Sequence, residues 1–191
     1  MTIGVYPGSF SPPTVAHLAV AEAAREHAGL ARLDLVLSRR ALGKEAASGP
    51  GPEERVELLL EVAATRSWLH VRLTDERLVA DIAAGYDVVV MGADKWAQVR
   101  DPAWYGGSAA ARDAAVARLP RVLVAPRHGH GLTPADVAPA ELLHVDARHH
   151  RVSSTAARAG REDWMLPEAV AWSRRRGTWT SGCGPAGGDD R

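Results

Sequence analysis

The stretch TIGVYPGSFSPPTVAH (residues 2–17) decides the expected fold. It opens with a short apolar run, stops at Pro7 and Gly8, and continues through a proline-stiffened loop to Thr14, a residue type that favours a helix N-cap. The Ala-rich segment that follows, residues 15–27, has the composition of a helix. We therefore predict a strand, a loop and a helix in direct succession, the first unit of an alternating α/β fold.

The same alternation continues along the chain. Further strands are expected at residues 32–37, 69–73, 87–92, 121–125 and 142–145, and further helices at residues 53–66, 108–118 and 167–176. The strands are continuously apolar, which is typical of a parallel sheet covered on both faces. We predict one α/β domain over residues 1–179, with a Rossmann-like, three-layer, doubly wound parallel sheet. Gly- and Pro-rich segments predict loops at 43–52 and 126–139, and residues 180–191 have the composition of a disordered tail.

Composition narrows the class of protein. The 191 residues are 46% hydrophobic and 24% charged, as expected of one globular domain. Basic and acidic residues both number 23, and this zero net charge argues against a general nucleic-acid partner. No apolar run approaches the roughly 20 residues of a membrane span, and a single cysteine, Cys183, allows no internal disulfide. We therefore expect a cytoplasmic protein with no membrane partner.

The loop after the first strand is the first candidate site, because ligands of parallel α/β sheets lie beyond the carboxyl ends of the strands. Thr14 and His17 are three residues apart and share the first turn of the expected helix. Exposed N–H groups favour an anion there, a protonated imidazole would add charge, and Gly8 would let the backbone approach a ligand closely. The alternative is a capping threonine beside a surface histidine. The loop lacks the Gly-Lys-Ser/Thr ending of a P-loop.

A second candidate site is the stretch VSSTAAR (residues 152–158). A Ser/Thr cap precedes a helical segment, and Ser154 and Arg158 are four residues apart, so a hydroxyl and a guanidinium share one face. This pattern again suits an anion, while a plain cap with a solvated arginine is the alternative. The preceding residues, His149 to Arg151, offer additional positive charge.

Together the two stretches resemble the signatures of the nucleotidyltransferase superfamily, G-x-F-x-P-x-[HT]-x-x-H and I-S-S-T-x-x-R, with Ala16 where glycine is common and Val152 in place of isoleucine. The resemblance implies attack by a substrate phosphate on the α-phosphorus of ATP, with Mg²⁺ bound mainly through the phosphates rather than by a protein metal site. It assigns His17 and Thr14 to the α- and β-phosphates. It assigns nucleotide binding to Gly8, Ser9 and Phe10, and the β- and γ-phosphates to Ser153, Ser154, Thr155 and Arg158.

The middle of the chain resembles the bacterial nicotinate mononucleotide adenylyltransferases less closely. The stretch MGAD (residues 91–94) is followed by DPAWY (residues 101–105). The resemblance implies that Gly92 and Asp94 meet the ribose of the nucleotide and that Trp104, or alternatively Trp96, lies beside the pyridine ring of the acceptor. It also implies that Lys44 positions a phosphate, as a catalytic residue beside His17, Thr14 and Arg158, and that Lys44 and Arg55 bind substrate. A tryptophan is equally typical of a core. The Tyr-Thr-x-[Asp/Asn]-Thr stretch usual in those enzymes is missing, since residues 74–86 predict only a short helix.

The leading hypothesis is adenylyl transfer from ATP to nicotinate or nicotinamide mononucleotide, a step of NAD biosynthesis. A related adenylyl- or cytidylyltransferase acting on another small phosphate or phosphonate, such as phosphopantetheine, is the first alternative. A nucleotide-binding regulator without turnover is the second. All three predict small-molecule partners, and the sequence leaves homo-oligomer formation open.

Overall fold

The computed structural model describes residues 1–40, 49–129 and 132–179. Six parallel strands form one sheet in the order β3-β2-β1-β4-β5-β6. Their bounds are β1 Ile3–Pro7, β2 Arg32–Ser38, β3 Leu69–Thr74, β4 Val88–Gly92, β5 Arg121–Ala125 and β6 Glu141–Leu142. The predicted α/β doubly wound sheet is confirmed. The last strand is shorter than expected, because after Leu143 the chain turns away toward a 3-10 turn at Ala147–His149 that Asp146 caps.

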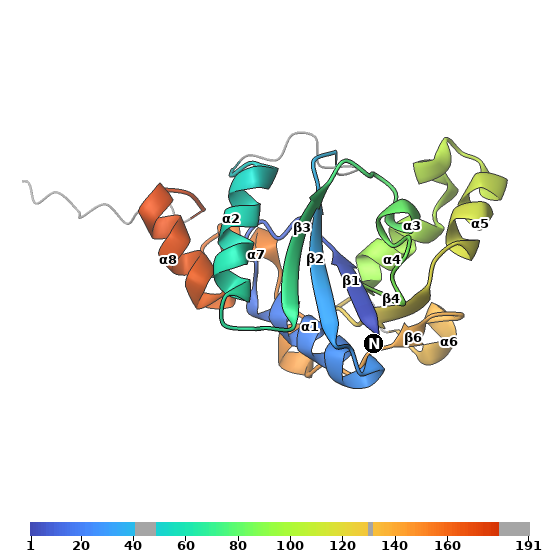
Figure 1. Cartoon of the computed structure of the whole chain (residues 1–191), viewed down its shortest axis with the longest axis horizontal. Coiled ribbons are helices and arrows are strands. Elements are labelled where there is room, and N and C mark those ends of the chain that lie inside the picture. Colours follow the sequence, from blue (N-terminus) through green and yellow to red (C-terminus); the bar gives the residue numbers. More distant parts are fainter. Residues whose placement is uncertain (41–48, 130–131, 180–191) are drawn as a thin grey trace, which may run out of the picture.

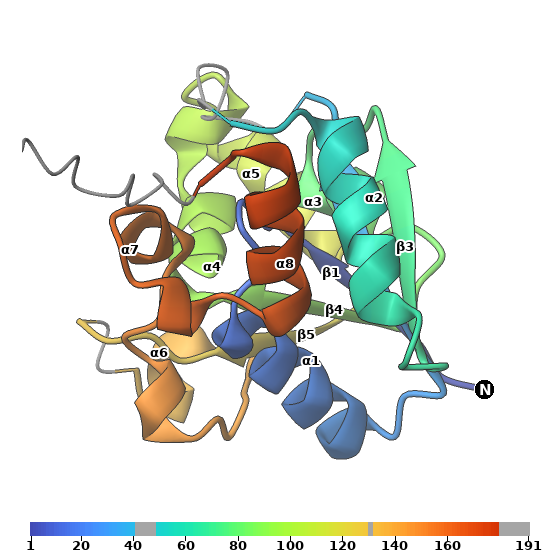
Figure 2. The same cartoon turned by 90° about the vertical axis from the view of Figure 1, so that its left-hand side faces the viewer.

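Helices cover both faces of the sheet (Figure 1). One face carries α1 Val15–Ala28, α2 Pro52–Ala63, α7 Ser154–Arg158 and α8 Pro167–Arg176. The other carries α3 Val79–Ile82, α4 Ala93–Arg100, α5 Ala109–Ala117 and α6 Pro134–Val137. Helix α8 lies beside α2 on the first face (Figure 2). None of the helices in the described ranges is long and apolar enough to cross a bilayer.

Two apolar cores, one on each side of the sheet, account for the three layers. Under α1, α2 and α8, Leu33, Leu58 and Trp172 are buried together. On the opposite face, Val89 and Trp96 are buried in a second cluster. The strands supply side chains to both clusters, which explains why their sequences are continuously apolar.

The prediction of a plain loop at residues 126–139 is wrong in part, because α6 lies within it. Thr133 and Asp136 form a reciprocal capping box, and Pro134 occupies the first helical position. This Thr-Pro-x-Asp pattern is a helix-start signal that the sequence itself contains. The expected tail at residues 180–191 lies outside the described residues.

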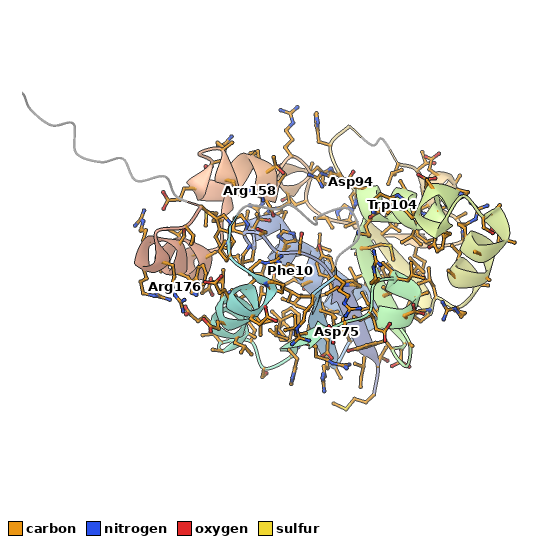
Figure 3. The ribbon with its side chains drawn as sticks, turned by 90° about the horizontal axis from the view of Figure 1, so that it is seen from above. Phe10, Asp75, Asp94, Trp104, Arg158 and Arg176 are labelled. Atoms are coloured by element: carbon orange, nitrogen blue, oxygen red, sulfur yellow. The ribbon has the colours of Figure 1, made fainter. Side chains whose placement is uncertain are left out.

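The strand order places the expected ligand crevice at one point. Strands β1 and β4 are neighbours, but the chain leaves β1 for α1 on one face and β4 for α4 on the other. In doubly wound sheets, such a reversal opens a crevice beyond the carboxyl ends of the two strands. Figure 3 looks onto this edge from above, with Asp94 between Arg158 and Trp104.

Candidate nucleotide-binding site

Helix α1 begins with a capping box in which a histidine takes the place of the usual acid. The Nδ1 atom of His17 lies 3.0 Å from the backbone nitrogen of Thr14 and 2.8 Å from its Oγ1. A backbone N–H can only donate, so Nδ1 carries a lone pair and the ring proton lies on Nε2. This geometry makes His17 a neutral N–H donor, without the charge that a protonated imidazole would add. Thr14, 1% exposed, directs its hydroxyl to His17, so it positions this ring.

Phe10 lies beneath the loop rather than on its ligand side. Its side chain is 1% exposed and packs edge-on against Tyr6, at 5.5 Å between ring centroids, and against His17, at 5.1 Å. A Cβ atom on Gly8 would come within 2.6 Å of the Phe10 ring. The assignment of Gly8 and Phe10 to nucleotide binding stays a prediction, and the buried Phe10 side chain leaves only the backbone of this residue to face a ligand. Glycine at position 8 makes room for Phe10, whose ring supports His17 from below.

The two sequence motifs meet in space. The Ser154 hydroxyl donates to the carbonyl of Pro12 at 2.8 Å across 142 positions of the chain, and the Arg158 guanidinium donates to the carbonyl of Ser11. Arg158 also donates to Thr155 Oγ1 at 3.3 Å. Two side-chain contacts thus join the loop before α1 to α7, and the third holds Arg158 against the first turn of its own helix.

Between these loops lies a cavity that we call the histidine cavity. Its polar wall consists of Ser9, Thr14, His17, Arg127, His149, His150, Ser153, Ser154 and Thr155. Gly92 also lines it, and an added Cβ there would meet open space. The structure therefore brings eight of the expected or suspected polar residues to one cavity, together with a guanidinium that the sequence did not indicate, while Arg158 lies outside this lining.

That guanidinium belongs to Arg127, which forms an ion pair with Asp94. Asp94 was expected at a ribose, and it lies in the first turn of α4 at the mouth of the crevice. Arg127 follows β5 closely, so its place beyond a carboxyl strand end was the signal that could have identified it.

The two histidines before the second motif are oriented by their own neighbours. His150 Nε2 lies 2.9 Å from the Val145 carbonyl, and Arg148 Nε donates to His149 Nε2 at 3.1 Å. Both rings line the histidine cavity, as the sequence position of the pair suggested.

A second cavity, the tryptophan cavity, opens on the other side of the β1 loop. It is lined by Trp104, Tyr105, Arg77, Lys95 and Gln98 together with Gly8, Ser9 and apolar side chains. Trp104 is 37% exposed, whereas Trp96 is 3% exposed within the core. Of the two candidate tryptophans, the structure thus leaves only Trp104 accessible to a ligand. Arg77 and Lys95 were not expected from the sequence.

Arg55 lies behind the loop. Its guanidinium donates to the carbonyl of Ser9 at 2.5 Å and to that of Gly51 at 3.2 Å, and burial lowers its pKa. It positions Ser9, and the structure does not bring it to either cavity lining. Lys44, which was expected to position a phosphate, lies outside the described residues.

Ser9 lines both cavities, so the two cavities adjoin at the carboxyl end of β1. A polar cavity with imidazole, hydroxyl and guanidinium donors suits a polyphosphate, and an aromatic cavity beside it suits a second, ring-bearing substrate. Among the described residues no group of three or more His, Cys, Asp or Glu side chains could hold a metal ion. A doubly wound sheet with such paired sites is suited to a transferase that binds a nucleotide and a second substrate.

Comparison with known proteins identifies the family. Residues 5–160 match the model of the cytidylyltransferase-like family, to which the chain therefore belongs. The chain is a nucleotidyltransferase, as the two motifs predicted.

Individual relatives agree with this assignment. A probable nicotinate-nucleotide adenylyltransferase of Gloeobacter violaceus is 28% identical over 206 positions, covering 93% of this chain and 95% of the relative. Two structures of Plasmodium falciparum nicotinic acid mononucleotide adenylyltransferase share the fold at a TM-score of 0.67. The one complexed with APC is 14% identical and the one complexed with NaAD is 12% identical. The matches cover 93% of this chain and 96% and 97% of those chains respectively.

Proposed function

We propose that this protein transfers the adenylyl group of ATP to nicotinate mononucleotide or nicotinamide mononucleotide, releasing pyrophosphate. The observation that carries this proposal is the junction of the two cavities at Ser9. A triphosphate in the histidine cavity and a pyridine mononucleotide in the tryptophan cavity would meet there. The relatives named above, which act on or bind compounds of this kind by their descriptions, support the same choice.

The reaction is an in-line displacement. An oxygen of the acceptor's phosphate forms a bond to the α-phosphorus, and the bond from the α-phosphorus to the bridging oxygen breaks, so that pyrophosphate leaves with that electron pair. The attacking phosphate is already anionic and needs no general base. Catalysis then consists of positioning the two phosphates and stabilising the charge that develops between them.

Each motif has a role in this scheme. His17 Nε2–H donates to a non-bridging oxygen of the α- or β-phosphate, and the Thr14 backbone keeps the proton on that nitrogen. Ser153, Ser154 and Thr155 line the end of the cavity assigned to the β- and γ-phosphates. Arg158 and Arg127 supply positive charge beside them.

Mg²⁺ fits this donor set only as a companion of the triphosphate. The described residues offer Asp94 at the cavity mouth, and it is paired with Arg127. Phosphate oxygens and water would therefore complete most of the coordination shell, as Mg²⁺ prefers. The ion would neutralise charge on the leaving pyrophosphate.

The test is pyrophosphate release across a panel of substrates, with the products identified by mass. ATP and CTP are each combined with nicotinate mononucleotide, nicotinamide mononucleotide and phosphopantetheine, using the wild type, His17→Ala and His27→Ala. His27 lies on the same helix at its far end and serves as the matched control.

Dinucleotide formation from ATP and a pyridine mononucleotide, lost in His17→Ala and kept in His27→Ala, is the expected result. A preference for CTP or for phosphopantetheine would replace this function with that of the corresponding transferase. Tight ATP binding without turnover on any acceptor would indicate a regulator.

A further inference from the structure

Tyr6 is a buried polar residue to which the reaction scheme gives no role. It lies near the carboxyl end of β1 and is 7% exposed. Its ring packs edge-on against Phe10, and its centroid lies 6.3 Å from that of the His17 ring. The Tyr6 side chain also lines the histidine cavity. Tyr6 therefore reaches this cavity from a central strand, beside the imidazole assigned to the phosphates.

The three tyrosines of the chain differ in how their hydroxyl groups are bonded. The Tyr86 hydroxyl donates to Oδ2 of Asp34 at 2.7 Å and accepts from Arg72 at 2.7 Å, and the Tyr105 hydroxyl donates to the Val99 carbonyl. The Tyr6 hydroxyl has no hydrogen-bond partner within residues 1–40, 49–129 and 132–179, and its oxygen remains open to the cavity. A buried hydroxyl without a partner is unfavourable, so this one calls for an acceptor from a ligand.

The hydroxyl is suited to donate rather than to ionise. Burial raises the pKa of Tyr6 far above its usual range, and the nearby charge of Arg127 opposes this effect only in part. The phenol therefore keeps its proton at neutral pH and offers it as an O–H donor. No aspartate or glutamate lines the described walls of the histidine cavity, so an anionic acceptor has to come with a ligand.

His149 presents a second donor of this kind in the same cavity. Its Nε2 accepts from Arg148 Nε at 3.1 Å, so the proton of the neutral ring lies on Nδ1. That Nδ1 is buried and has no hydrogen-bond partner among the described residues. Two donors without partners at one cavity indicate a ligand that is rich in acceptor atoms, as a triphosphate is.

Resting on the proposed function, we propose that the Tyr6 hydroxyl is a further nucleotide-binding group, which donates a hydrogen bond to a non-bridging phosphate oxygen of ATP beside the one that His17 meets. The adjoining rings of Tyr6 and His17 make this pairing possible. A hydrogen bond from a neutral hydroxyl to an anionic oxygen is strong, and it satisfies the one tyrosine hydroxyl that the free protein leaves without a partner in the described structure.

The test uses Tyr6→Phe, which removes the hydroxyl and keeps the ring that packs against Phe10. Tyr86→Phe is the matched control, because its hydroxyl is bonded within the protein and Tyr86 lines neither cavity. Calorimetry measures the Kd of ATP and of adenosine, without an acceptor, for the wild type and both variants. Urea unfolding measures the stability of each ligand-free protein.

We expect Tyr6→Phe to weaken ATP binding by about 10- to 100-fold, the effect of losing one hydrogen bond to a charged group. Its affinity for adenosine should be unchanged, and its free energy of unfolding should be unchanged or higher. Tyr86→Phe should show the opposite pattern, with lower stability and unchanged ATP affinity, because it removes a hydroxyl that has partners within the protein.

Unchanged ATP affinity in Tyr6→Phe would overturn the proposal. Equal losses for ATP and adenosine would also overturn it, because they would place the hydroxyl at the nucleoside. A loss of stability as large as that of Tyr86→Phe would show a structural role instead. If the wild type binds ATP and turns over no acceptor, the proposed function fails, while the ATP affinity of Tyr6→Phe still decides the role of the hydroxyl. If the wild type binds no ATP, both fail.

Discussion

The histidine cavity and the tryptophan cavity differ in how their side chains are held. At the histidine cavity, the Ser154 hydroxyl of the lining is bonded to the carbonyl of Pro12 in the opposite loop, and Arg158, outside the lining, is bonded to the carbonyl of Ser11. In the tryptophan cavity, the polar groups lie on α4 and on the segment before α3, against an aromatic and apolar lining. The first arrangement orders donors for phosphate chemistry, while the second is suited to recognition of a ring. Variants in the two cavities should therefore fail in different ways.

The largest effect is expected for His17→Ala. The neutral imidazole is a preorganised donor, and loss of one such donor costs about 10²–10³-fold in kcat. Steady-state kinetics with saturating ATP and acceptor measure it, and His27→Ala should retain the wild-type kcat. Near-normal turnover of His17→Ala would show that the capping-box histidine has only a structural role.

Arg158→Gln tests the contact between the loops. It removes a charge and the bond to the Ser11 carbonyl, so kcat/KM for ATP should fall about 10- to 100-fold. Arg161→Gln, three residues later and paired with Asp163, is the control with the same charge change. If both variants behave alike, the loss reflects general surface charge and the comparison between the cavities is weakened.

Trp104→Ala should act on the acceptor alone. An aromatic contact contributes about 0.5–1.5 kcal/mol, so the KM for the acceptor should rise up to about tenfold with the KM for ATP unchanged. Trp104→Phe keeps a ring and should recover most of the loss. Equal increases in both KM values would contradict the separation of the two cavities.

The smallest effect on catalysis is expected for Glu141→Gln, because Glu141 lies at the edge of the sheet, away from both cavities. Hydrogen bonds from Arg121 and His27 lower the pKa of Glu141 from 4.5 to about 2. Because the pKa is lower in the folded state, the contacts stabilise the fold above about pH 4.5, and this contribution is lost as the pH falls toward 2.

The carboxylate is partly exposed, so we expect the variant to lose only about 1 kcal/mol of unfolding free energy at neutral pH. Urea unfolding as a function of pH should show the two proteins converging near pH 2, with kinetic constants for both substrates unchanged at pH 7. A stability difference that persists at low pH would contradict the ionic origin.

Much of the fold and half of the site follow from local patterns. The apolar runs and helix caps predicted the strand and helix alternation because burial on two faces and capping both leave signals within a few residues. The motifs around His17 and Ser154 were found for the same reason, since each is a single loop-to-helix junction. Thr133 shows that such a signal also marked α6, which was expected to be loop.

Other features were decided only by packing between distant segments. Phe10 faces the core because Tyr6 and His17 leave room for its ring there. Trp104 is accessible and Trp96 is not, because α4 turns Trp96 toward the sheet. Arg127 and Asp94 form an ion pair although they lie in different crossover connections. Arg77 and Lys95 likewise come from different connections and line the same cavity. The sequence by itself therefore determined the layered sheet and its two phosphate-type motifs, whose physics is local. The tertiary structure alone decided which cations and rings share a cavity, because that depends on where separate elements come together beyond the sheet.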